Sequence, residues 1–487
     1  MDEKKIRTLF KRVFLGLQLG MIIVLSQGVA FGAEKFEAAL GQHINQKWTG
    51  DFNEMVKDNV IRVLVPYSKT FYFFDKGAQK GASYELVTAF ERMVNTELKT
   101  RHVKVHTVFI PTSRDRLIPG LVEGLGDIAV GNLTITNDRS KQVDFSDPFG
   151  TGVAEILVTG PGAPLFKSVS DLSGHKIHVR KSSSYYESLV RVNKALSSAG
   201  KSKIKIVEAN ENLEDEDLLE MLNAGLISMM VIDSHKGKFW VQIFENIRLH
   251  PEVKFRENVR IAWAIRKNSP ELKTVINRFV KANKKGTLMG NMIFNRYLKN
   301  TKYVKNNLSE GDRAKFKDAG PFFQKYGKMY DFDALMLAAL AYQESTIDQR
   351  KRSPVGAIGV MQILPTTALD KNVNIPGIDK IDPNIHAGTK YLRFIADRYF
   401  SNPGIDPLNQ VLLTFAAYNA GPAKISKLRK EASSLNLDPN IWFKNVELVA
   451  AKRIGRETVQ YVSNIFKYYI AYTYSMDQLK AKAKIKK

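Results

Sequence analysis

The chain has 487 residues, a formal net charge of +24 and no cysteine. Its length exceeds the usual size of one domain, so we expect two or three domains with separate cores. Its apolar fraction of 44% and charged fraction of 25% are those of a folded protein and argue against a disordered chain. The lack of cysteine excludes disulfides, thiolate metal sites and a lipid-bearing N-terminal cysteine.

Residues 1–33 have the layout of a secretory signal peptide. Five basic residues precede the apolar run VFLGLQLGMIIVL, and small residues follow it. Cleavage after Ala30 or Gly32 would place small residues at both recognition positions. The alternative is a retained anchor helix over 13–31, which is nearly long enough to span a bilayer but is interrupted by polar residues. We favour export with cleavage.

The net charge stays strongly positive without this segment. Its five basic and two acidic residues contribute three charges, so the remaining chain carries +21 of the original +24. Such a charge favours an anionic partner. For an exported chain we expect acidic cell-wall polymer or anionic lipid, and no nucleic acid. Lysines that only keep the surface solvated would account for the charge equally well.

From residue 60 to 233, segments typical of strands alternate with segments typical of helices. In the first half, the predicted strands are VIRVLVPYS, VKVHTVFIP and DIAVGN, and the predicted helices are ASYELVTAFERMVN and SRDRLIPGLVEGLG. In the second half, the predicted strands are HKIHVRKS, KIKIVEA and SMMVID, and the predicted helices cover 185–199 and 215–225. The alternation predicts parallel α/β sheets, and two such units in sequence predict two lobes that face a cleft.

The character of the sequence changes after Pro270. Residues 271–300 are helical in pattern, and the polar segment 301–328 is expected to be a linker or a solvated connecting helix. The predicted domains are an α/β domain over 34–300, a linker over 301–328, an all-α domain over 329–475 and a basic, frayed tail over 476–487. The sequence contains no zinc-protease helix motif, no phosphate-binding glycine loop and no metal-ligand spacing of histidines, so we expect no metal and no cofactor.

Glu344 ends an almost wholly apolar segment of the all-α domain. Residues 334–342, ALMLAALAY, are apolar on every side of a helix and therefore predict a helix buried in a core. Burial disfavours the charged carboxylate and raises its pKa, and the negative end of the helix dipole acts in the same direction. A carboxyl protonated near neutral pH suits a general acid for glycoside cleavage. From helix placement alone, a buried glutamate satisfied by backbone or by a basic partner is an equal alternative.

Five short motifs follow one another from this glutamate onward. They are ES at 344–345, Ser353, GVMQ at 359–362, AYN at 417–419 and ETVQYV at 457–462. Together they resemble the soluble-lytic-transglycosylase domain, which is related to goose-type lysozyme. Val360 and Ile347 replace a leucine and an aromatic residue that are usual in that family. Both replacements are apolar, so they affect local packing more than chemistry.

The resemblance implies that Glu344 is the catalytic acid and base. The residues that would line the sugar cleft, contact the substrate or support Glu344 are Ser353, Met361, Gln362, Tyr418, Asn419 and Tyr461.

The expected reaction follows from the number of carboxyl groups. Glycoside hydrolysis normally needs two, and the sequence offers no second acidic residue in a setting like that of Glu344. Asp348 lies in a polar loop, and Glu457, the stronger alternative, lies in a helix beside two arginines. One carboxyl suffices in the lytic transglycosylase reaction, in which the C6 hydroxyl of MurNAc attacks C1, releases GlcNAc and leaves a 1,6-anhydromuramoyl end on peptidoglycan. A lysozyme-type hydrolase is the alternative and predicts a second carboxylate.

Residues 132–149, NLTITNDRSKQVDFSDPF, resemble the signature of polar amino-acid-binding proteins of transport systems, and further matches extend the likeness over 59–298. In that family a Thr-Ile-Thr loop and the following arginine hold a ligand α-carboxylate, and an acidic residue after a second-lobe strand holds the α-amino group. The matching residues are Thr134, Thr136, Arg139 and Asp233. Ser182 to Ser184 precede a helix whose N-terminus could bind an anion.

Two alternatives to an amino-acid site remain for this module. Arg139 could form an ion pair within its own lobe, to Asp144 or Asp147. The loop SKTFYFFDKGAQKG lacks the small residues expected around an amino-acid side chain, so the ligand could be larger, such as a muropeptide stem, or absent.

The order of export signal, binding module and transglycosylase resembles a family of periplasmic enzymes that associate peripherally with the outer membrane. That resemblance implies that the first module regulates the second. The main alternative is a periplasmic amino-acid or peptide-binding protein whose helical domain docks on peptidoglycan without catalysis.

Overall fold

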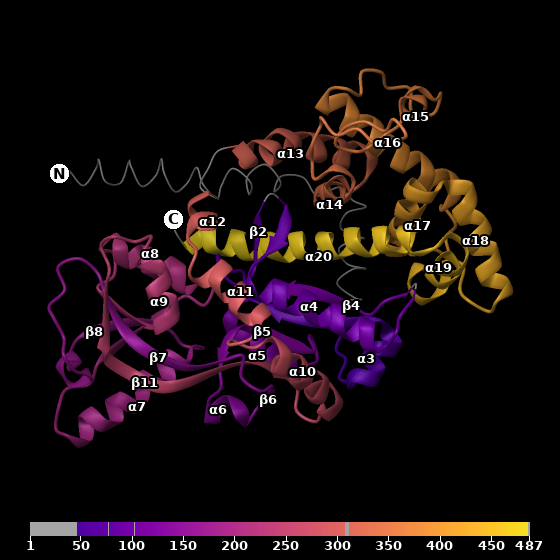
Figure 1. Cartoon of the computed structure of the whole chain (residues 1–487). Helices are drawn as coiled ribbons and strands as arrows, with labels where there is room; N and C mark the ends of the chain where they lie inside the picture. Colours follow the sequence, from indigo (N-terminus) through magenta and orange to yellow (C-terminus); the bar gives the residue numbers. More distant parts are fainter. Residues whose placement is uncertain (1–45, 76, 102, 307–310, 486–487) are drawn as a thin grey trace. The chain divides into compact units, whose positions relative to one another are not determined.

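The computed structural model describes residues 46–75, 77–101, 103–306 and 311–485 (Figure 1). The chain divides into an α/β unit, which contains 106–307, and a helical unit, which contains 308–480. The predicted signal segment 1–33 lies outside the described residues. Within the described ranges, no helix is both long and apolar enough to cross a membrane.

The α/β unit is built on a nine-stranded sheet. The strand order is β4 (His106–Pro111), β1 (Val60–Val65), β5 (Ile128–Thr134), β11 (Arg248–Ile265), β7 (Gly150–Thr159), β10 (Met229–Asp233), β8 (Lys176–Arg180) and β9 (Lys205–Ala209), and the short β6 (Asp144–Phe145) pairs with β11. β1 runs parallel to β4 and β5, and β8 runs parallel to β9 and β10. The two predicted α/β halves are therefore confirmed.

Two long antiparallel strands join these halves and were not predicted. β11 pairs with β5 through Ile261–Ile265 and with β7 through Arg248–Ile261. This shared strand divides the unit into a first lobe around β1, β4 and β5 and a second lobe around β8, β9 and β10. The sequence of β11, RLHPEVKFRENVRIAWAI, contains a proline and several charges, which weaken a strand pattern.

Helices cover both lobes. Those of the first lobe are α3 (Phe52–Asp58), α4 (Ala82–Glu97), α5 (Arg114–Val122), α6 (Asn137–Ser140), α10 (Pro270–Asn283) and α11 (Leu288–Leu298), and those of the second are α7 (Ser184–Ser198), α8 (Asp215–Asn223) and α9 (Ser234–Trp240). The predicted helical stretch 271–300 is two helices, because Lys284 adopts an extended conformation after α10. The loop expected at 68–81 contains a hairpin of β2 (Phe73–Asp75) and β3 (Ala78–Lys80).

Each lobe has its own apolar core. In the first lobe the rings of Phe90, Trp263 and Phe279 pack with centroids 5.6 to 5.8 Å apart. In the second lobe Leu189 and Val231 belong to a buried cluster between the sheet and α7. The burial of these apolar side chains stabilises each lobe.

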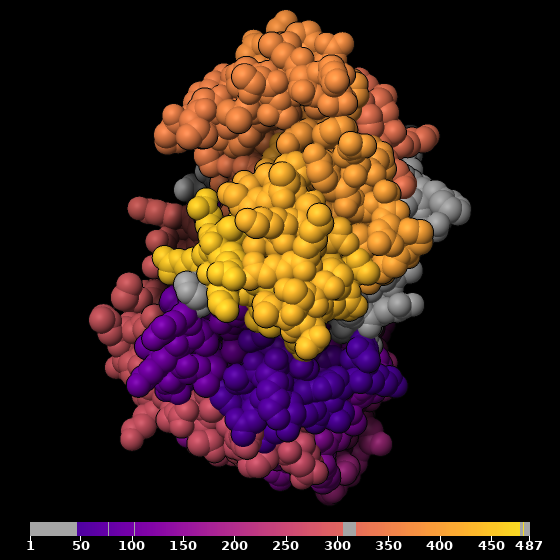
Figure 2. All heavy atoms as spheres, turned by 90° about the vertical axis from the view of Figure 1, so that its right-hand side faces the viewer, coloured from indigo at the N-terminus to yellow at the C-terminus, as the bar shows by residue number. Residues whose placement is uncertain are grey.

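The second unit is helical, as predicted. Its elements are α13 (Gly311–Tyr330), α14 (Ala334–Ser345), α15 (Pro365–Leu369), α16 (Ile381–Tyr399), α17 (Pro407–Ala420), α18 (Pro422–Ser434), the π-helical turn η2 (Trp442–Val446), α19 (Glu447–Ile454) and α20 (Arg456–Ile485). α17, α18, η2 and α19 pack against one another and are drawn from orange to yellow in Figure 2.

The boundaries of the helical unit differ from the predicted ones. Ala319, Phe323 and Tyr326 of α13 are buried, and α13 packs against α14 and α16. The end of the predicted linker therefore belongs to the helical core. Residues 476–485, predicted as a frayed tail, continue α20, and Met476 is still buried.

Candidate active site and ligand cleft

Glu344 lies in the last turn of α14. The residues from Met336 to Ala341 are all buried, which confirms the predicted core helix. The next two residues after the helix, Thr346 and Ile347, have left-handed φ angles of 56° and 55°. This conformation ends the helix and directs the chain into the loop that carries the next motif.

The Glu344 carboxyl has the electrostatic setting of a general acid. Burial raises its pKa to about 7, against smaller lowering effects of a hydrogen bond from Tyr461 and of the charge on Lys351. The Tyr461 hydroxyl donates to Oε1 of Glu344. Lys351 Nζ donates to the backbone carbonyl of Glu344 at 2.7 Å. At neutral pH a large share of this carboxyl is therefore protonated.

Two further contacts connect the motifs. Tyr418 Oη donates to the carbonyl of Met361 at 2.8 Å, and Thr458 Oγ1 donates to Oδ1 of Asn419 at 2.7 Å. Burial, with the charge of Glu344, raises the pKa of Tyr418 and of Tyr461 well above the usual value, so both hydroxyls stay protonated donors. The structure thus brings α17 to the loop and to α20 around Glu344.

The loop between α14 and α15 is held by side chains that sequence reasoning missed. Asn384 of α16 is fully buried, and its Nδ2 donates to the carbonyls of Ile358 and Ile378 at 2.8 and 2.9 Å. Its Oδ1 accepts from the backbone N–H of Met361 at 2.8 Å. The only sequence signal is an amide on an otherwise apolar helix face.

The other predicted residues of the loop bind mainly the loop itself. Ser353 Oγ accepts from the backbone N–H of Ala357 at 2.9 Å. Gln362 has a φ of 45°, and its Nε2 donates to the carbonyl of Gly359 at 2.8 Å. Met361 is fully buried, and a Cβ added to Gly388 would lie 2.6 Å from its side chain. The structure therefore shows Ser353 and Gln362 bonded within their own loop, and Met361 packed against Gly388 of α16.

Neither alternative carboxyl shares the setting of Glu344. Glu457 is exposed at the start of α20, and Asp348 forms an ion pair with Arg350 at 3.1 Å. Among the described residues, no acidic side chain contributes to the pKa shift of Glu344. Sequence reasoning missed Glu447, which is buried in α19, has a pKa raised to about 7 by desolvation and accepts from the backbone N–H of Lys444 at 3.2 Å.

The α/β unit has a cavity of about 260 Å³ that is lined by residues of both lobes. Several of the predicted ligand residues are among them. They are Thr134 and Arg139 of the first lobe and Ser182, Ser183, Ser184 and Asp233 of the second. Arg139 does not pair with Asp144 or Asp147, the partners considered from the sequence. Its Nε lies 3.6 Å from Oε1 of Glu187 in the second lobe.

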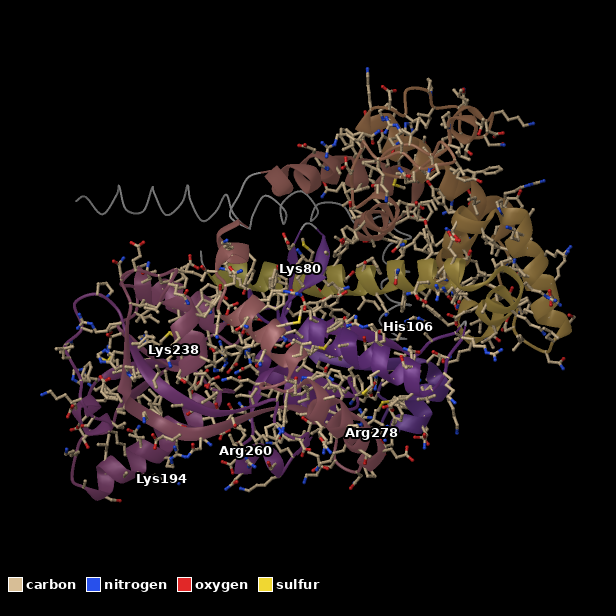
Figure 3. All side chains as sticks on the ribbon, in the orientation of Figure 1. Lys80, His106, Lys194, Lys238, Arg260 and Arg278 are labelled. Carbon is tan, nitrogen blue, oxygen red and sulfur yellow. The ribbon has the colours of Figure 1, made fainter. Side chains whose placement is uncertain are left out.

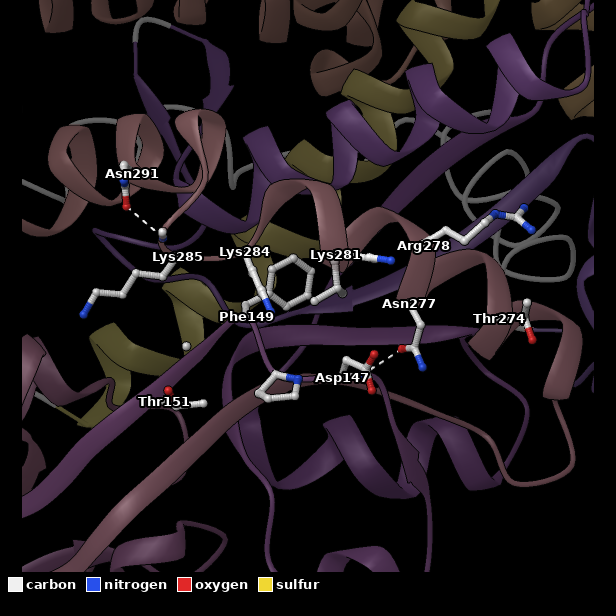
Figure 4. Close-up of a pocket in the computed structure, with 14 residues that line it drawn as sticks. Asp147, Phe149, Thr151, Thr274, Asn277, Arg278, Lys281, Lys284, Lys285 and Asn291 are labelled. Carbon is white, nitrogen blue, oxygen red and sulfur yellow. Dashed lines mark hydrogen bonds between the residues drawn. The ribbon is translucent and has the colours of Figure 1, made fainter.

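A larger hollow of about 1030 Å³ lies between α10 and the chain that enters β7 (Figure 4). Its lining includes the four basic residues Arg278, Lys281, Lys284 and Lys285. Other exposed basic residues project from separate elements, among them Lys194 of α7, Lys238 of α9 and Arg260 of the shared strand β11 (Figure 3). The positive charge of this unit is therefore spread over its surface. This distribution agrees with the alternative in which the lysines only keep the protein solvated.

Comparison with known families gives a match for each of the two parts of the chain. Residues 321–440 match the transglycosylase SLT domain, and residues 61–300 match the bacterial extracellular solute-binding proteins of family 3. In this chain a part that matches the solute-binding proteins therefore precedes a part that matches the SLT domain.

Two relatives that align with most of the chain are named membrane-bound lytic murein transglycosylase F. That of Desulfosudis oleivorans is 27% identical over 431 residues, which cover 84% of this chain and 89% of the relative. That of Shewanella sediminis is 28% identical over 452 residues, which cover 88% of each. The chain is similar to these two relatives over most of its own length and of theirs.

Solved structures of binding proteins are similar to half of the chain. An ancestral arginine-binding protein bound to arginine has 25% identity and a TM-score of 0.40, and covers 49% of this chain and 98% of its own. A binding component of an ABC transporter from Wolinella succinogenes, complexed with lysine, has 22% identity and a TM-score of 0.42, and covers 51% and 99%.

Proposed function

We propose that this chain cleaves the MurNAc-β-1,4-GlcNAc bond of peptidoglycan without water, with Glu344 as its catalytic acid and base. The observation that carries this proposal is a carboxyl whose pKa is raised to about 7 by burial, with no contribution from a second acidic group in the described structure. A protonated carboxyl can donate its proton to a glycosidic oxygen, and a lone carboxyl needs a nucleophile from the substrate.

In the first step Glu344 protonates the glycosidic oxygen, and the bond between this oxygen and C1 of MurNAc breaks. In the second step the Glu344 carboxylate takes the proton of the C6 hydroxyl, and O6 forms a bond to C1. The proton returns to Glu344, no water is consumed, and the product carries a 1,6-anhydro ring. The hydrogen bond from Tyr461 orients the carboxyl and stabilises the carboxylate between the steps.

The remaining residues divide into substrate contacts and supports. Asn419 is exposed and Gln362 is half-buried, so both amides are available to sugar hydroxyls. Met361 and Tyr418 act through their shared hydrogen bond, which fixes the loop beside Glu344. Ser353 keeps the loop closed through its bond to Ala357.

The proposal extends to the setting of the enzyme. Export is supported by the signal-like segment, and the names of the relatives support a membrane-associated, peptidoglycan-directed role. We assign the protein to the periplasm, peripheral to the outer membrane, with peptidoglycan strands as its substrate. The solute-binding module would bind a small ligand. A ligand that binds the open or the closed form of the module more tightly would shift the equilibrium between these forms, and this shift would change the activity of the catalytic domain.

Digestion of purified peptidoglycan sacculi tests this function. The chain without residues 1–33 and its Glu344→Gln variant are incubated with sacculi, and mass spectrometry identifies the soluble products. Anhydromuramoyl products from the parent and none from the variant are expected. Reducing-end muramoyl products would favour the hydrolase, and no product from the parent would favour the non-catalytic binding protein.

A further inference from the structure

A carboxylate from the second lobe reaches into the first lobe of the solute-binding module. Thr136 Oγ1 donates to Oε1 of Glu187 at 3.2 Å, and Nε of Arg139 lies 3.6 Å from the same oxygen. Oε2 of Glu187 lies 3.5 Å from Arg256 of its own lobe. One carboxylate is therefore held between a hydroxyl and a guanidinium of the opposite lobe.

Each nitrogen of the Arg139 guanidinium already faces a protein acceptor. The residue is only 8% exposed, its Nη1 donates to the carbonyl of Thr134 at 3.1 Å, and its Nη2 donates to the carbonyl of Ser182 at 2.8 Å. With Nε facing Glu187, each guanidinium nitrogen has a protein partner. A free carboxylate normally binds arginine through two parallel hydrogen bonds. Two of the five N–H groups already donate to carbonyls and the Nε–H faces Glu187, so a free carboxylate would have to share Nη1 and Nη2 with backbone and compete with Glu187 for Nε.

Other contacts across the lobes act in the same direction. Arg114 of the first lobe binds Glu214 of the second through Nε and Nη2 at 2.8 to 3.0 Å. Asn132 Nδ2 donates to Oδ2 of Asp233 at 2.7 Å. The module is thus closed by its own side chains around the position where a ligand would sit.

We propose that Glu187 is a built-in carboxylate that fills the Thr136–Arg139 corner of the cleft and so determines the specificity of the module. Ligands that need this corner for a free α-carboxylate are excluded, and the cleft accepts only molecules that bind elsewhere along it. This inference concerns the solute-binding module and does not depend on the reaction of the helical unit.

Glu187 and the carboxylate of a dissolved ligand would compete for the same place at Thr136 and Arg139, and Glu187 has the advantage. A side chain tethered across a cleft acts at an effective concentration on the order of millimolar or higher. A free amino acid would exchange one carboxylate for another at Arg139 and would gain little from that exchange. Removing Glu187 should therefore leave a cationic corner that a small carboxylate can refill.

Chemical rescue with acetate tests the proposal on the full chain. Because the chain has no cysteine, Lys141→Cys at the end of α6 and Lys194→Cys in α7 introduce two exposed label positions, one on each lobe. Nitroxide labels are attached to these two cysteines. Pulsed electron paramagnetic resonance then measures the distance between the labels in the protein that keeps Glu187 and in its Glu187→Ala variant. Acetate is then added, with chloride at equal ionic strength as its control. Melting temperatures are recorded in parallel.

We expect one short distance when Glu187 is present, longer distances in Glu187→Ala, and recovery of the short distance by acetate only in that variant. Adding Arg139→Ala to Glu187→Ala should abolish the rescue. Glu208→Ala removes an exposed carboxylate of the same lobe and should change neither readout. The proposal is wrong if Glu187→Ala leaves the distance unchanged, if acetate acts equally on both proteins, or if a pool of free L-amino acids raises the melting temperature of the parent as much as that of the variant.

Discussion

The hydroxyl of Tyr461 donates a hydrogen bond to the carboxyl of Glu344, although the two residues lie 117 positions apart in the chain. This contact joins the start of α20 to the end of α14. It lowers the pKa of Glu344 while burial raises it, and the balance lies at about 7. The acid is therefore poised to lose and regain a proton near neutral pH.

Glu344→Gln should make the helical unit more stable at alkaline pH. The folded carboxyl has a pKa of about 7, above the usual 4.5, so its stabilising protonation is complete below pH 4.5 and is lost as the pH rises through 7. Glutamine avoids this loss, which we put at up to about 3 kcal/mol above pH 8. Urea unfolding at pH 4 and pH 8.5 measures the difference.

Glu447→Gln is the matched control for that variant, because the pKa of Glu447 is also raised to about 7 by burial. It should gain similar stability at alkaline pH and keep its activity on sacculi, whereas Glu344→Gln gains stability and loses activity. Loss of activity in both variants would assign Glu447 a part in the reaction.

Activity should fall above pH 7 as Glu344 loses the proton that it must donate. Tyr461→Phe removes the hydrogen bond that lowers the Glu344 pKa, so the alkaline limb of kcat/KM should move to higher pH, while kcat falls by about tenfold as the carboxyl loses its orientation. Release of soluble fragments across pH 5 to 9 measures both effects. Tyr399→Phe is the control, and a limb that does not move would contradict the role given to Tyr461.

The loop glycines should differ in what they tolerate. Gly359 has a φ of +76°, and an added Cβ would lie 2.5 Å from Gln349 and 2.6 Å from Asn384. Gly356 has a φ of +86° and nothing within 4 Å of such a Cβ. Gly356→Ala should cost about 1 kcal/mol of backbone strain, whereas Gly359→Ala should cost about 3 kcal/mol and most of the activity. Equal costs in thermal unfolding would contradict the close packing of this loop.

Asn384→Ala should remove the hydrogen bonds that hold the loop between α14 and α15 against α16. It leaves the carbonyls of Ile358 and Ile378 and the N–H of Met361 without their present partner. Buried groups without a partner cost about 1 to 3 kcal/mol each, so we expect a loss of about 3 kcal/mol after relaxation, together with a lower kcat. Asn372→Ala, at an exposed turn, is the control. Unchanged stability would mean that Asn384 does not support the loop.

The sequence predicted what depends on local pattern. The apolar run before Glu344 and the alternating strands and helices of the α/β unit have periodicities that can be recognised within single segments. β11 was missed because its charged residues and its proline interrupt the apolar alternation that is typical of a strand. Its pairing partners, β5 and β7, also lie far from it in the sequence. Asn384 and Glu187 were missed for the same reason, since only the fold shows which carbonyls and which arginine they face.

The central claim is that one carboxyl, with a nucleophile from the substrate, breaks the glycosidic bond. Digestion of sacculi in water enriched with ¹⁸O measures this most directly, because hydrolysis places a solvent oxygen on C1 of MurNAc and ring closure does not. We predict muramoyl products without ¹⁸O at C1. Products labelled at C1 from the earliest time points would show that water attacks, and would contradict the single-carboxyl account.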